Sequence, residues 1–180
     1  MTTPTPIPAP TPTPAPTTSP TPPELTARDV MVTTLITVGA DDGLLLSWEL
    51  LCQAGVHHVP VLDHGRCIGL VSERELALEV ARNPLGHPRR VMREIAHEAP
   101  AYVRLATPVR TVAATLLRTG QDAILVHDDE NRIAGIVTVH DLLRALAGQV
   151  VPRPRDEGWD AAATLFRLTP VLPAPEGPAL

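Results

Sequence analysis

An internal repeat limits the possible folds of this chain more than any other feature of its sequence. The segment from Ala54 to Leu76 reappears, with one inserted residue, from Thr119 to Leu143. A Val-Met pair recurs as well, at residues 30–31 and 91–92. A repeat of this size is one supersecondary unit that cannot bury its own apolar face, so the two copies must pack together. The chain therefore encodes two similar units that share a core.

Hydrophobic periodicity divides the first copy into strand, helix, strand, strand and helix. A short apolar run at 35–38 predicts the first strand, and apolar residues at helical spacing over 44–52 predict a helix. Gly55 is placed to end that helix in the left-handed conformation. Two segments rich in β-branched residues, 57–62 and 67–71, then predict a hairpin.

The second copy predicts the same order of elements. Its strands and helices are expected at 102–105, 109–119, 123–126, 133–137 and 139–146. Pro84 and Pro88 prevent the connecting segment 85–97 from forming one continuous helix. We predict an α/β (α+β) module of two pseudo-twofold related repeats, with the first at 24–84 and the connection and second repeat at 85–148.

Each copy has a hydroxyl and a carboxylate at the start of its last helix. Ser72 with Glu75, and Thr138 with Asp141, have the spacing of a capping box, in which the two side chains satisfy backbone N–H groups reciprocally. Capping alone typically contributes about 1 kcal/mol. The pattern therefore has a purely structural explanation beside any functional one.

At these residues the sequence resembles the CBS domain family, whose tandem pairs are called Bateman modules. The resemblance covers residues 27–147 and is carried by the Val-Met pairs, by GVHHVPVLD at 55–63, and by GLVSERE and GIVTVHD at 69–75 and 135–141. It implies a regulatory module that is not an enzyme. It also implies a cleft between the repeats for an adenine-containing ligand, namely AMP, ADP, ATP or S-adenosylmethionine, with no required cofactor.

The resemblance assigns four ligand-binding positions at the helix starts. Thr138 and Asp141 match the family's hydroxyl and its ribose-binding carboxylate in the second repeat. Ser72 and Glu75 are their counterparts in the first repeat, where the glutamate is one methylene longer than the usual aspartate. A carboxylate can accept hydrogen bonds from both ribose hydroxyls, and N–H groups at a helix start can meet a phosphate.

Two further ligand-binding candidates, His57 and His58, match basic positions of the family that point toward phosphates. The same positions in the second repeat are Asp122 and Ala123, which would repel or ignore a phosphate. The resemblance therefore places the better ribose acid and the phosphate ligands in different half-sites. An alternative hypothesis is an interaction or dimerisation module with empty, degenerate sites.

A third hypothesis is a metal or redox role for Cys52, Cys67 and the histidines. We predict instead that the chain has no metal site. His57 and His58 adjoin in a predicted strand, so their side chains should face opposite sides. The sequence also has no motif of a nucleophile elbow, phosphate loop, dinucleotide fingerprint or zinc protease. We therefore expect no catalytic residues.

Composition limits the partners of the module. The net charge is -5 and aromatic residues are 2% of the chain, so we expect no nucleic-acid partner. No apolar run approaches the roughly 20 residues that cross a bilayer, and no secretory signal precedes the repeats, so we expect a cytoplasmic protein without a membrane partner. The resemblance implies a homodimer, with a separate protein as the possible effector.

The two ends of the chain differ in composition from the repeats. Residues 1–23 are almost entirely Thr, Pro, Ala and Ser, and we predict a disordered tail. The C-terminal segment 149–180 is also rich in proline, with one apolar patch at 159–168. Trp159, Ala163 and Phe166 recur there at helical spacing, which is compatible with a short docking helix or with a weakly ordered tail.

Overall fold

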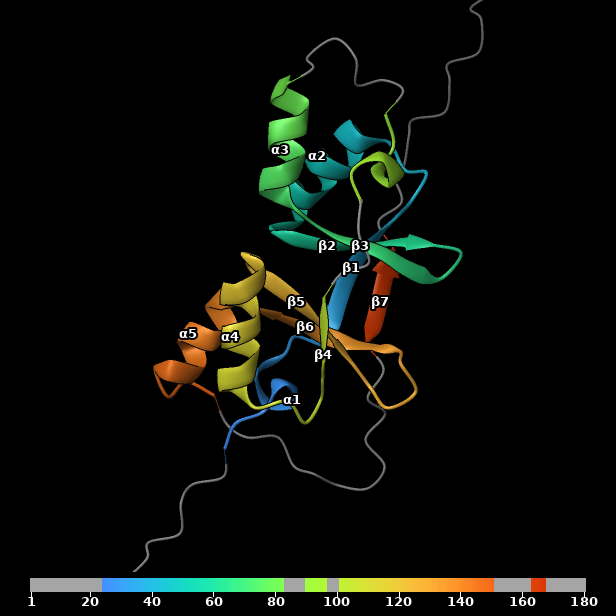
Figure 1. Ribbon diagram of the computed structural model, residues 1–180. Helices are drawn as coiled ribbons and strands as arrows, with labels where there is room; N and C mark the ends of the chain where they lie inside the picture. The colour runs from blue at the N-terminus through green and yellow to red at the C-terminus, as the bar shows by residue number, and fades with distance from the viewer. Residues whose placement is uncertain (1–23, 83–89, 97–100, 151–162, 168–180) are drawn as a thin grey trace, which may run out of the picture.

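The computed structural model describes residues 24–82, 90–96, 101–150 and 163–167. They form two halves, one above the other in Figure 1, each with a small sheet and two main helices. Helices α2 to α5 lie on one side of the molecule and the two hairpin turns point to the other. The predicted pair of strand-helix-strand-strand-helix units is confirmed.

The first half contains the longer strands. Strand β1 (Thr34–Gly39) leads into helix α2 (Leu44–Ala54), and the hairpin of β2 (His58–Asp63) and β3 (Arg66–Ser72) leads into helix α3 (Glu73–Arg82). Gly55 ends α2 with φ 63°, in the left-handed conformation that its sequence position predicts. Strand β1 runs parallel to β2, and β2 is antiparallel to β3.

The second half repeats this topology. Strand β4 (Tyr102–Arg104), helix α4 (Val109–Thr119), the hairpin β5 (Ala123–His127) and β6 (Ile133–Thr138), and helix α5 (Val139–Leu146) follow in order. Each hairpin has a register shift at the corresponding place, between Val61 and Leu62 in the first half and between Val126 and His127 in the second. The duplication therefore extends to irregularities of the sheets.

The segment before each repeat packs into the half formed by the other repeat. Helix α1 (Ala27–Val30) and Met31 lie in the core of the second half, whereas Met92, in the short 3-10 helix η2 (Met92–Glu94), lies in the core of the first. Both methionines are at most 1% exposed. Burial of such a side chain contributes about 2 kcal/mol. The recurring Val-Met pairs are therefore exchanged anchors that hold the two halves together.

Two strand glycines make room for these exchanged segments. A Cβ at Gly135 would lie 2.6 Å from the Val32 carbonyl oxygen, and one at Gly69 would lie 2.7 Å from the Ala96 Cβ. Val32 and Ile136 also exchange two backbone hydrogen bonds of 2.9 and 3.0 Å. The glycines of the two repeated motifs thus serve the close approach of backbone from the other half.

A third apolar cluster joins the halves. Leu35 of β1 packs with Ala123 of β5 and Ile136 of β6, all at most 6% exposed. Leu70, Ile133 and Ala163 pack around them. The two repeats therefore share buried contacts, as their size requires.

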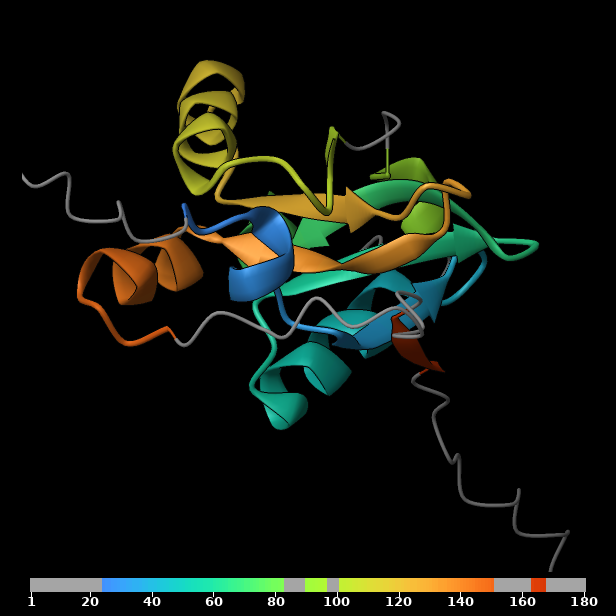
Figure 2. The same cartoon turned by 90° about the horizontal axis from the view of Figure 1, so that it is seen from below.

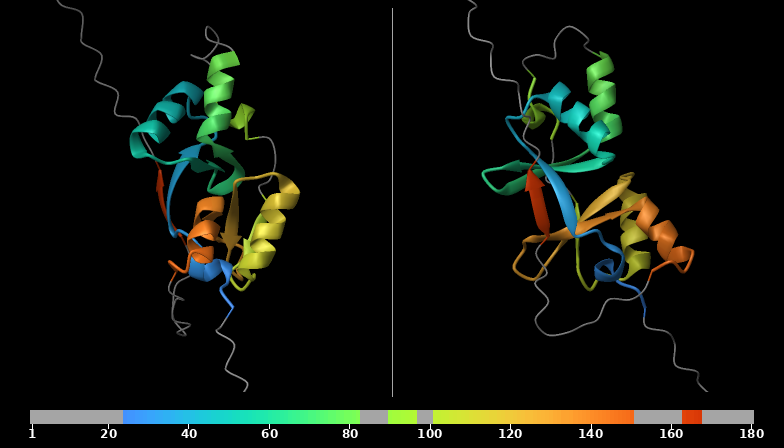
Figure 3. Two further views of the ribbon diagram at one scale, coloured as in Figure 1. Left: turned by 90° about the vertical axis from the view of Figure 1, so that its left-hand side faces the viewer. Right: turned by 180° about the vertical axis from the view of Figure 1, so that it is seen from behind.

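The C-terminal patch contributes a strand, which is neither the short docking helix nor the weakly ordered tail that the sequence left open. Residues Thr164–Arg167 form β7, which pairs in parallel with β1 and extends the first sheet to the order β3-β2-β1-β7 (Figure 3). The extended conformation leaves Leu165 and Phe166 41% and 54% exposed. The segment does not form a helix, despite the helical spacing of its apolar residues, because the unpaired edge of β1 offers it backbone hydrogen bonds. Trp159 lies outside the described residues, as does the predicted N-terminal tail.

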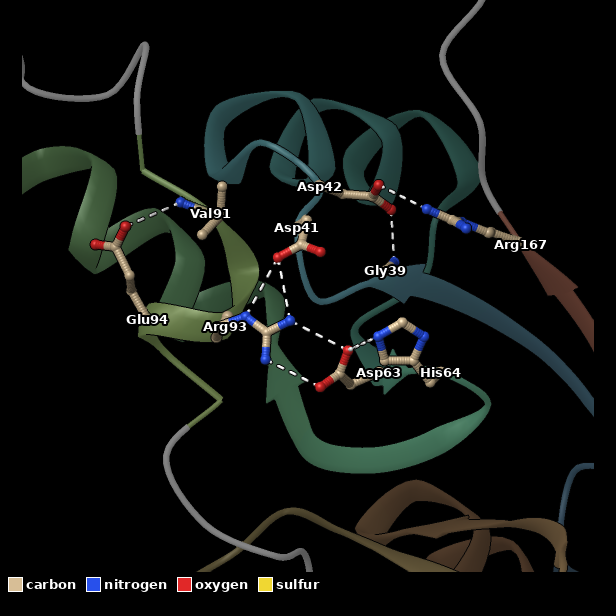
Figure 4. Close-up of polar contacts among 9 residues, drawn as sticks. All are labelled: Gly39, Asp41, Asp42, Asp63, His64, Val91, Arg93, Glu94 and Arg167. Atoms are coloured by element: carbon tan, nitrogen blue, oxygen red, sulfur yellow. Dashed lines mark hydrogen bonds and ion pairs between the residues drawn. The ribbon is translucent and has the colours of Figure 1, made fainter.

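Ion pairs brace the turn between β1 and α2 (Figure 4). The Asp42 carboxylate accepts hydrogen bonds from the Gly39 N–H at 2.5 Å and from Arg167 at 2.9 Å. The Arg93 guanidinium bridges Asp41 and Asp63, with N···O distances of 3.0 to 3.2 Å. These hydrogen bonds hold the pKa of Asp63 below its ordinary value. Residues from β7 and η2 are thereby tied to the first repeat.

Candidate functional site

A large cavity lies between the two repeats, whose arrangement Figure 2 shows from below. Its volume is about 510 Å³, within the usual range of small-molecule sites. We call it the apolar cleft because six of its residues are valine, leucine or isoleucine. It is lined by Val32, Thr34, Leu35, Ile36, Val56, His57, His58, Asp122, Ile136, Thr138, Val139 and His140.

Thr138 lies in the apolar cleft at the junction of β6 and α5, where it caps the helix. Its hydroxyl donates to Asp141 Oδ2 at 2.7 Å and accepts from the Asp141 N–H at 3.3 Å. The Thr138 N–H donates to the same carboxylate oxygen at 2.9 Å. The capping box that the sequence predicts is complete, and it fixes the orientation of both side chains.

His57 and His58 both line the apolar cleft, but their side chains differ in exposure. His57 lies just before β2 and its side chain is 77% exposed, whereas His58, the first residue of β2, is partly buried. His57 Nδ1 lies 2.8 Å from Glu73 Oε2, and this hydrogen bond is the main cause that lowers the pKa of Glu73. Burial lowers the pKa of His58, although the nearby Asp122 opposes the shift.

Asp141, the predicted ribose acid, belongs to a neighbouring cavity. It is 6% exposed and lines a polar hollow of about 360 Å³ together with Asp29 and Arg144. This polar hollow shares Val32 and Thr34 with the apolar cleft. The carboxylate and the hydroxyl of one capping box therefore lie in the walls of two adjoining cavities.

The counterpart of the apolar cleft in the first repeat is smaller and more polar. This small cleft, about 260 Å³, is lined by Ser72, Arg74, Glu75 and Leu78 of the first repeat and by Gly120–Ala123 of the second, with His58 and Leu70. Ser72 N–H and hydroxyl donate to Glu75 Oε2 at 2.7 and 2.8 Å. The longer glutamate thus forms the same capping box as aspartate does in the second repeat.

Each cleft combines residues of both repeats, which corrects the grouping expected from the sequence. His57 and His58 lie with Thr138, not with Ser72 alone, because the repeats face each other across the pseudo-twofold axis. Sequence reasoning also missed His140, Arg144 and the segment 32–36. The recurring Val-Met pair was the one available signal for that segment, since it marks the chain that crosses to the other half.

The described residues give no support to a metal or redox centre. Across the described ranges, no group of three or more His, Cys, Asp or Glu side chains is placed to hold a metal ion. Cys52 and Cys67 are free thiols, and desolvation is the main cause that raises the pKa of each. A raised pKa disfavours the reactive thiolate.

Comparison with known proteins identifies the fold family. The profile of the CBS domain matches residues 27–82 and 92–148, which are the two repeats. The chain belongs to the CBS domain family. CBS pairs are generally regulatory rather than catalytic modules. In this CBS pair, none of the described helices is long and apolar enough to cross a membrane.

Curated relatives share the repeats at low identity. One is an L-aspartate semialdehyde sulfurtransferase of Methanocaldococcus jannaschii, which is 24% identical over a match that covers 71% of this chain and 24% of the relative. Another is an uncharacterised protein of the same organism, of which the match covers 45%. The chain thus spans less than half of either protein. A CBS domain-containing protein of Dictyostelium discoideum is 25% identical over 73% of this chain and 97% of its own.

Solved structures of CBS pairs match the whole module. The CBS domain pair of protein MJ0100, in complex with 5′-methylthioadenosine and S-adenosyl-L-methionine, has a TM-score of 0.62 at 24% identity, covering 71% of this chain and 99% of its own. CBSX2 in complex with AMP has a TM-score of 0.59 at 25% identity, and the match covers 69% of this chain and 97% of CBSX2.

Proposed function

We propose that this CBS pair is a regulatory module that binds an adenine-containing ligand in the apolar cleft. The candidates are AMP, ADP, ATP and S-adenosylmethionine. The bound ligand would favour one arrangement of the two repeats and thereby change how the module contacts a partner protein or a second copy of itself. In this proposal the module regulates without a reaction of its own.

The observation that carries the proposal is a cavity between the repeats with apolar walls and a few polar groups. Val32 and Leu35 of the first repeat and Ile136 of the second contribute apolar side chains to the lining, and apolar walls are typical of sites that bind a base. Thr138, His57 and His58 supply polar atoms at its edge. The AMP and S-adenosyl-L-methionine complexes of the two CBS pairs named above support this ligand class.

Thermal unfolding of the full chain with each ligand in turn tests the proposal. A ligand that binds the folded state alone stabilises it by about 2.7 kcal/mol at a hundred times its dissociation constant. For a domain of this size that corresponds to a shift of several degrees. Thr138→Val should reduce the shift, whereas Thr115→Val, on α4 and outside the lining of the cleft, should not. Absence of any shift with all four ligands would refute the proposal.

A second candidate is a module that works through protein contacts with empty clefts. The observation that favours it is the completeness of both capping boxes. Thr138 and Asp141, like Ser72 and Glu75, already satisfy each other in the structure. In that case the unfolding midpoint would be independent of every adenine compound.

We also propose that the module pairs with a second copy through its helical side. Leu117 on α4 and Leu146 on α5 are 84% and 86% exposed, and Leu78 on α3 is 48% exposed. Exposed leucines on adjoining helices are typical of an interaction surface. Leu117→Asp with Leu146→Asp should convert a dimer to a monomer in light scattering; a wild-type monomer at high concentration would contradict the proposal.

A further inference from the structure

The charged groups of the apolar cleft are the starting point for an inference about its ligand. Among the described residues that line it, none is arginine or lysine, and the titratable side chains are His57, His58, His140 and Asp122. Asp122 stands at the position of His57 in the repeat alignment and lines the small cleft as well. The one fixed charge of this lining is therefore negative.

Two of the three histidines are poorly suited to compensate for that charge. His57 is engaged by a carboxylate, because its Nδ1 lies 2.8 Å from Glu73 Oε2. Burial lowers the pKa of His58, which favours its neutral form. A phosphate in the apolar cleft would thus meet the carboxylate of Asp122, while the nearby His57 is already paired with Glu73.

The start of α5 offers few free donors to an anion. The N–H and hydroxyl of Thr138 and the N–H of Asp141 are used in the capping box. The Val139 N–H donates to the Asp122 carbonyl oxygen at 2.9 Å. A helix N-terminus binds phosphate through such N–H groups, and here those of Thr138, Val139 and Asp141 are already occupied.

The polar hollow beside the cleft has the same excess of negative charge. It contains the one guanidinium of the two adjoining cavities, Arg144, together with the carboxylates of Asp29 and Asp141. Both carboxylates belong to buried caps and are at most 7% exposed. An extended ligand that reaches from the cleft into this hollow would find acceptors for an ammonium and one partner for a carboxylate.

We propose that the apolar cleft selects an adenosine compound whose 5′ carbon carries an uncharged or positively charged sulfur group, a thioether or a sulfonium, and discriminates against 5′-phosphates. This inference rests on the proposed function and narrows its ligand class. Like charges in one site disfavour the wrong ligand, while the apolar walls accept a thioether without loss of hydrogen bonds. Asp122 is the residue that determines this specificity.

Isothermal titration of the full chain with 5′-methylthioadenosine, S-adenosylmethionine, AMP and ATP tests the inference. 5′-Methylthioadenosine and AMP share the nucleoside and differ at the 5′ group, so they form a matched pair. We expect 5′-methylthioadenosine to bind about tenfold more tightly than AMP, and ATP to bind more weakly than AMP. Added salt should narrow the difference, because it screens the repulsion.

Asp122 variants supply the second measurement. Asp122→Lys changes the charge by two units and should improve AMP affinity by at least about fivefold, the size of one unit-charge interaction across about 4 Å of water, while leaving the affinity for 5′-methylthioadenosine nearly unchanged. Asp129→Lys, in the exposed turn of the same repeat, is the matched control and should change neither. If AMP or ATP binds the wild type as tightly as 5′-methylthioadenosine, the inference is wrong and the proposed function stands. If none of the four compounds binds, both fail.

Discussion

The first repeat starts its last helix with Ser72 and Glu75, and the second starts its last helix with Thr138 and Asp141. The hydrogen bonds of the two capping boxes agree within a few tenths of an ångström. Their surroundings differ, because Glu75 is exposed whereas Asp141 is 6% exposed beneath α1 and the segment that follows it. The same motif thus contributes an exposed carboxylate to the small cleft in one repeat and a nearly buried carboxylate to the polar hollow in the other.

This difference shows that a repeated motif does not by itself make a repeated site. The apolar cleft is about twice as large as the small cleft, at 510 against 260 Å³, although the strands and helices correspond. Each cleft takes part of its lining from the opposite repeat, where His57 and Asp122 occupy equivalent positions. Substitutions at equivalent positions therefore measure how far the symmetry of the fold extends to stability and binding.

The largest effect is expected for the leucine that anchors the last helix of each repeat. Leu76 is fully buried, whereas its counterpart Leu142 is partly exposed. We predict that Leu76→Ala lowers the free energy of unfolding by about 3 kcal/mol and Leu142→Ala by about half as much. Urea unfolding measures both, and equal losses would show that the two cores are packed alike.

The next largest loss of stability is expected when the strand glycines Gly135 and Gly69 are replaced by alanine. An alanine at Gly135 would press against the Val32 carbonyl oxygen, which a hydrogen bond to Ile136 holds in place, whereas one at Gly69 would press against Ala96. We expect a loss of about 2 to 3 kcal/mol for Gly135→Ala and about 1 to 2 kcal/mol for Gly69→Ala, within the range of overpacked sites. Thermal unfolding checks the order, and a larger loss at Gly69 would contradict it.

Substitution of the acidic residue in each capping box should lower the free energy of unfolding by a smaller amount, which again differs between the repeats. Asp141→Ala leaves the Thr138 N–H and hydroxyl without a partner in a nearly buried place, so we predict a loss of about 2 kcal/mol, against less than about 1 kcal/mol for Glu75→Ala. Asp141→Ala should also abolish the ligand-induced shift of the unfolding midpoint. Unchanged affinity in this variant would remove Asp141 from the site.

The smallest expected effect is the pH dependence of the two half-buried histidines, one in each repeat. Burial is the main cause that lowers the pKa of both His58 and His127 from the ordinary 6.5. A lowered pKa in the folded state means that the full stability is present above pH 6.5 and is lost as the pH falls toward the folded-state pKa, by about 1 kcal/mol or less for each group.

Thermal midpoints between about pH 7.5 and 5.5 measure this loss. His58→Gln and His127→Gln should each flatten the profile. Asp122 and Glu75 oppose the pKa shift of His58, as Asn131 and Asp128 oppose that of His127, while His57 and Arg104 add to the respective shifts. We therefore expect the two variants to flatten the profile to a similar extent. An identical profile in wild type and both variants would contradict the predicted titration.

Local sequence determined the elements of this fold because their signals act over a few residues. The predicted ranges 109–119 and 139–146 agree with α4 and α5, and the caps at Ser72 and Thr138 were predicted with their partners. Most strand ends in the structure lie one residue from the ends that the sequence predicts. Periodicity, capping residues and the left-handed Gly55 are sufficient for this level of description.

The strands of the two repeats and their capping boxes were determined by the sequence alone, since each depends on residues close together in the chain, and the duplication was visible because these local patterns recur in the same order. The tertiary structure decided which residues share a cavity. It exchanged Met31 and Met92 between the halves, placed His57 and Thr138 in the lining of one cavity, and made a strand of residues 164–167. The physical reason is that burial of apolar side chains and pairing at an open strand edge stabilise contacts between segments that are distant in the sequence. No local pattern encodes which distant segment will make these contacts.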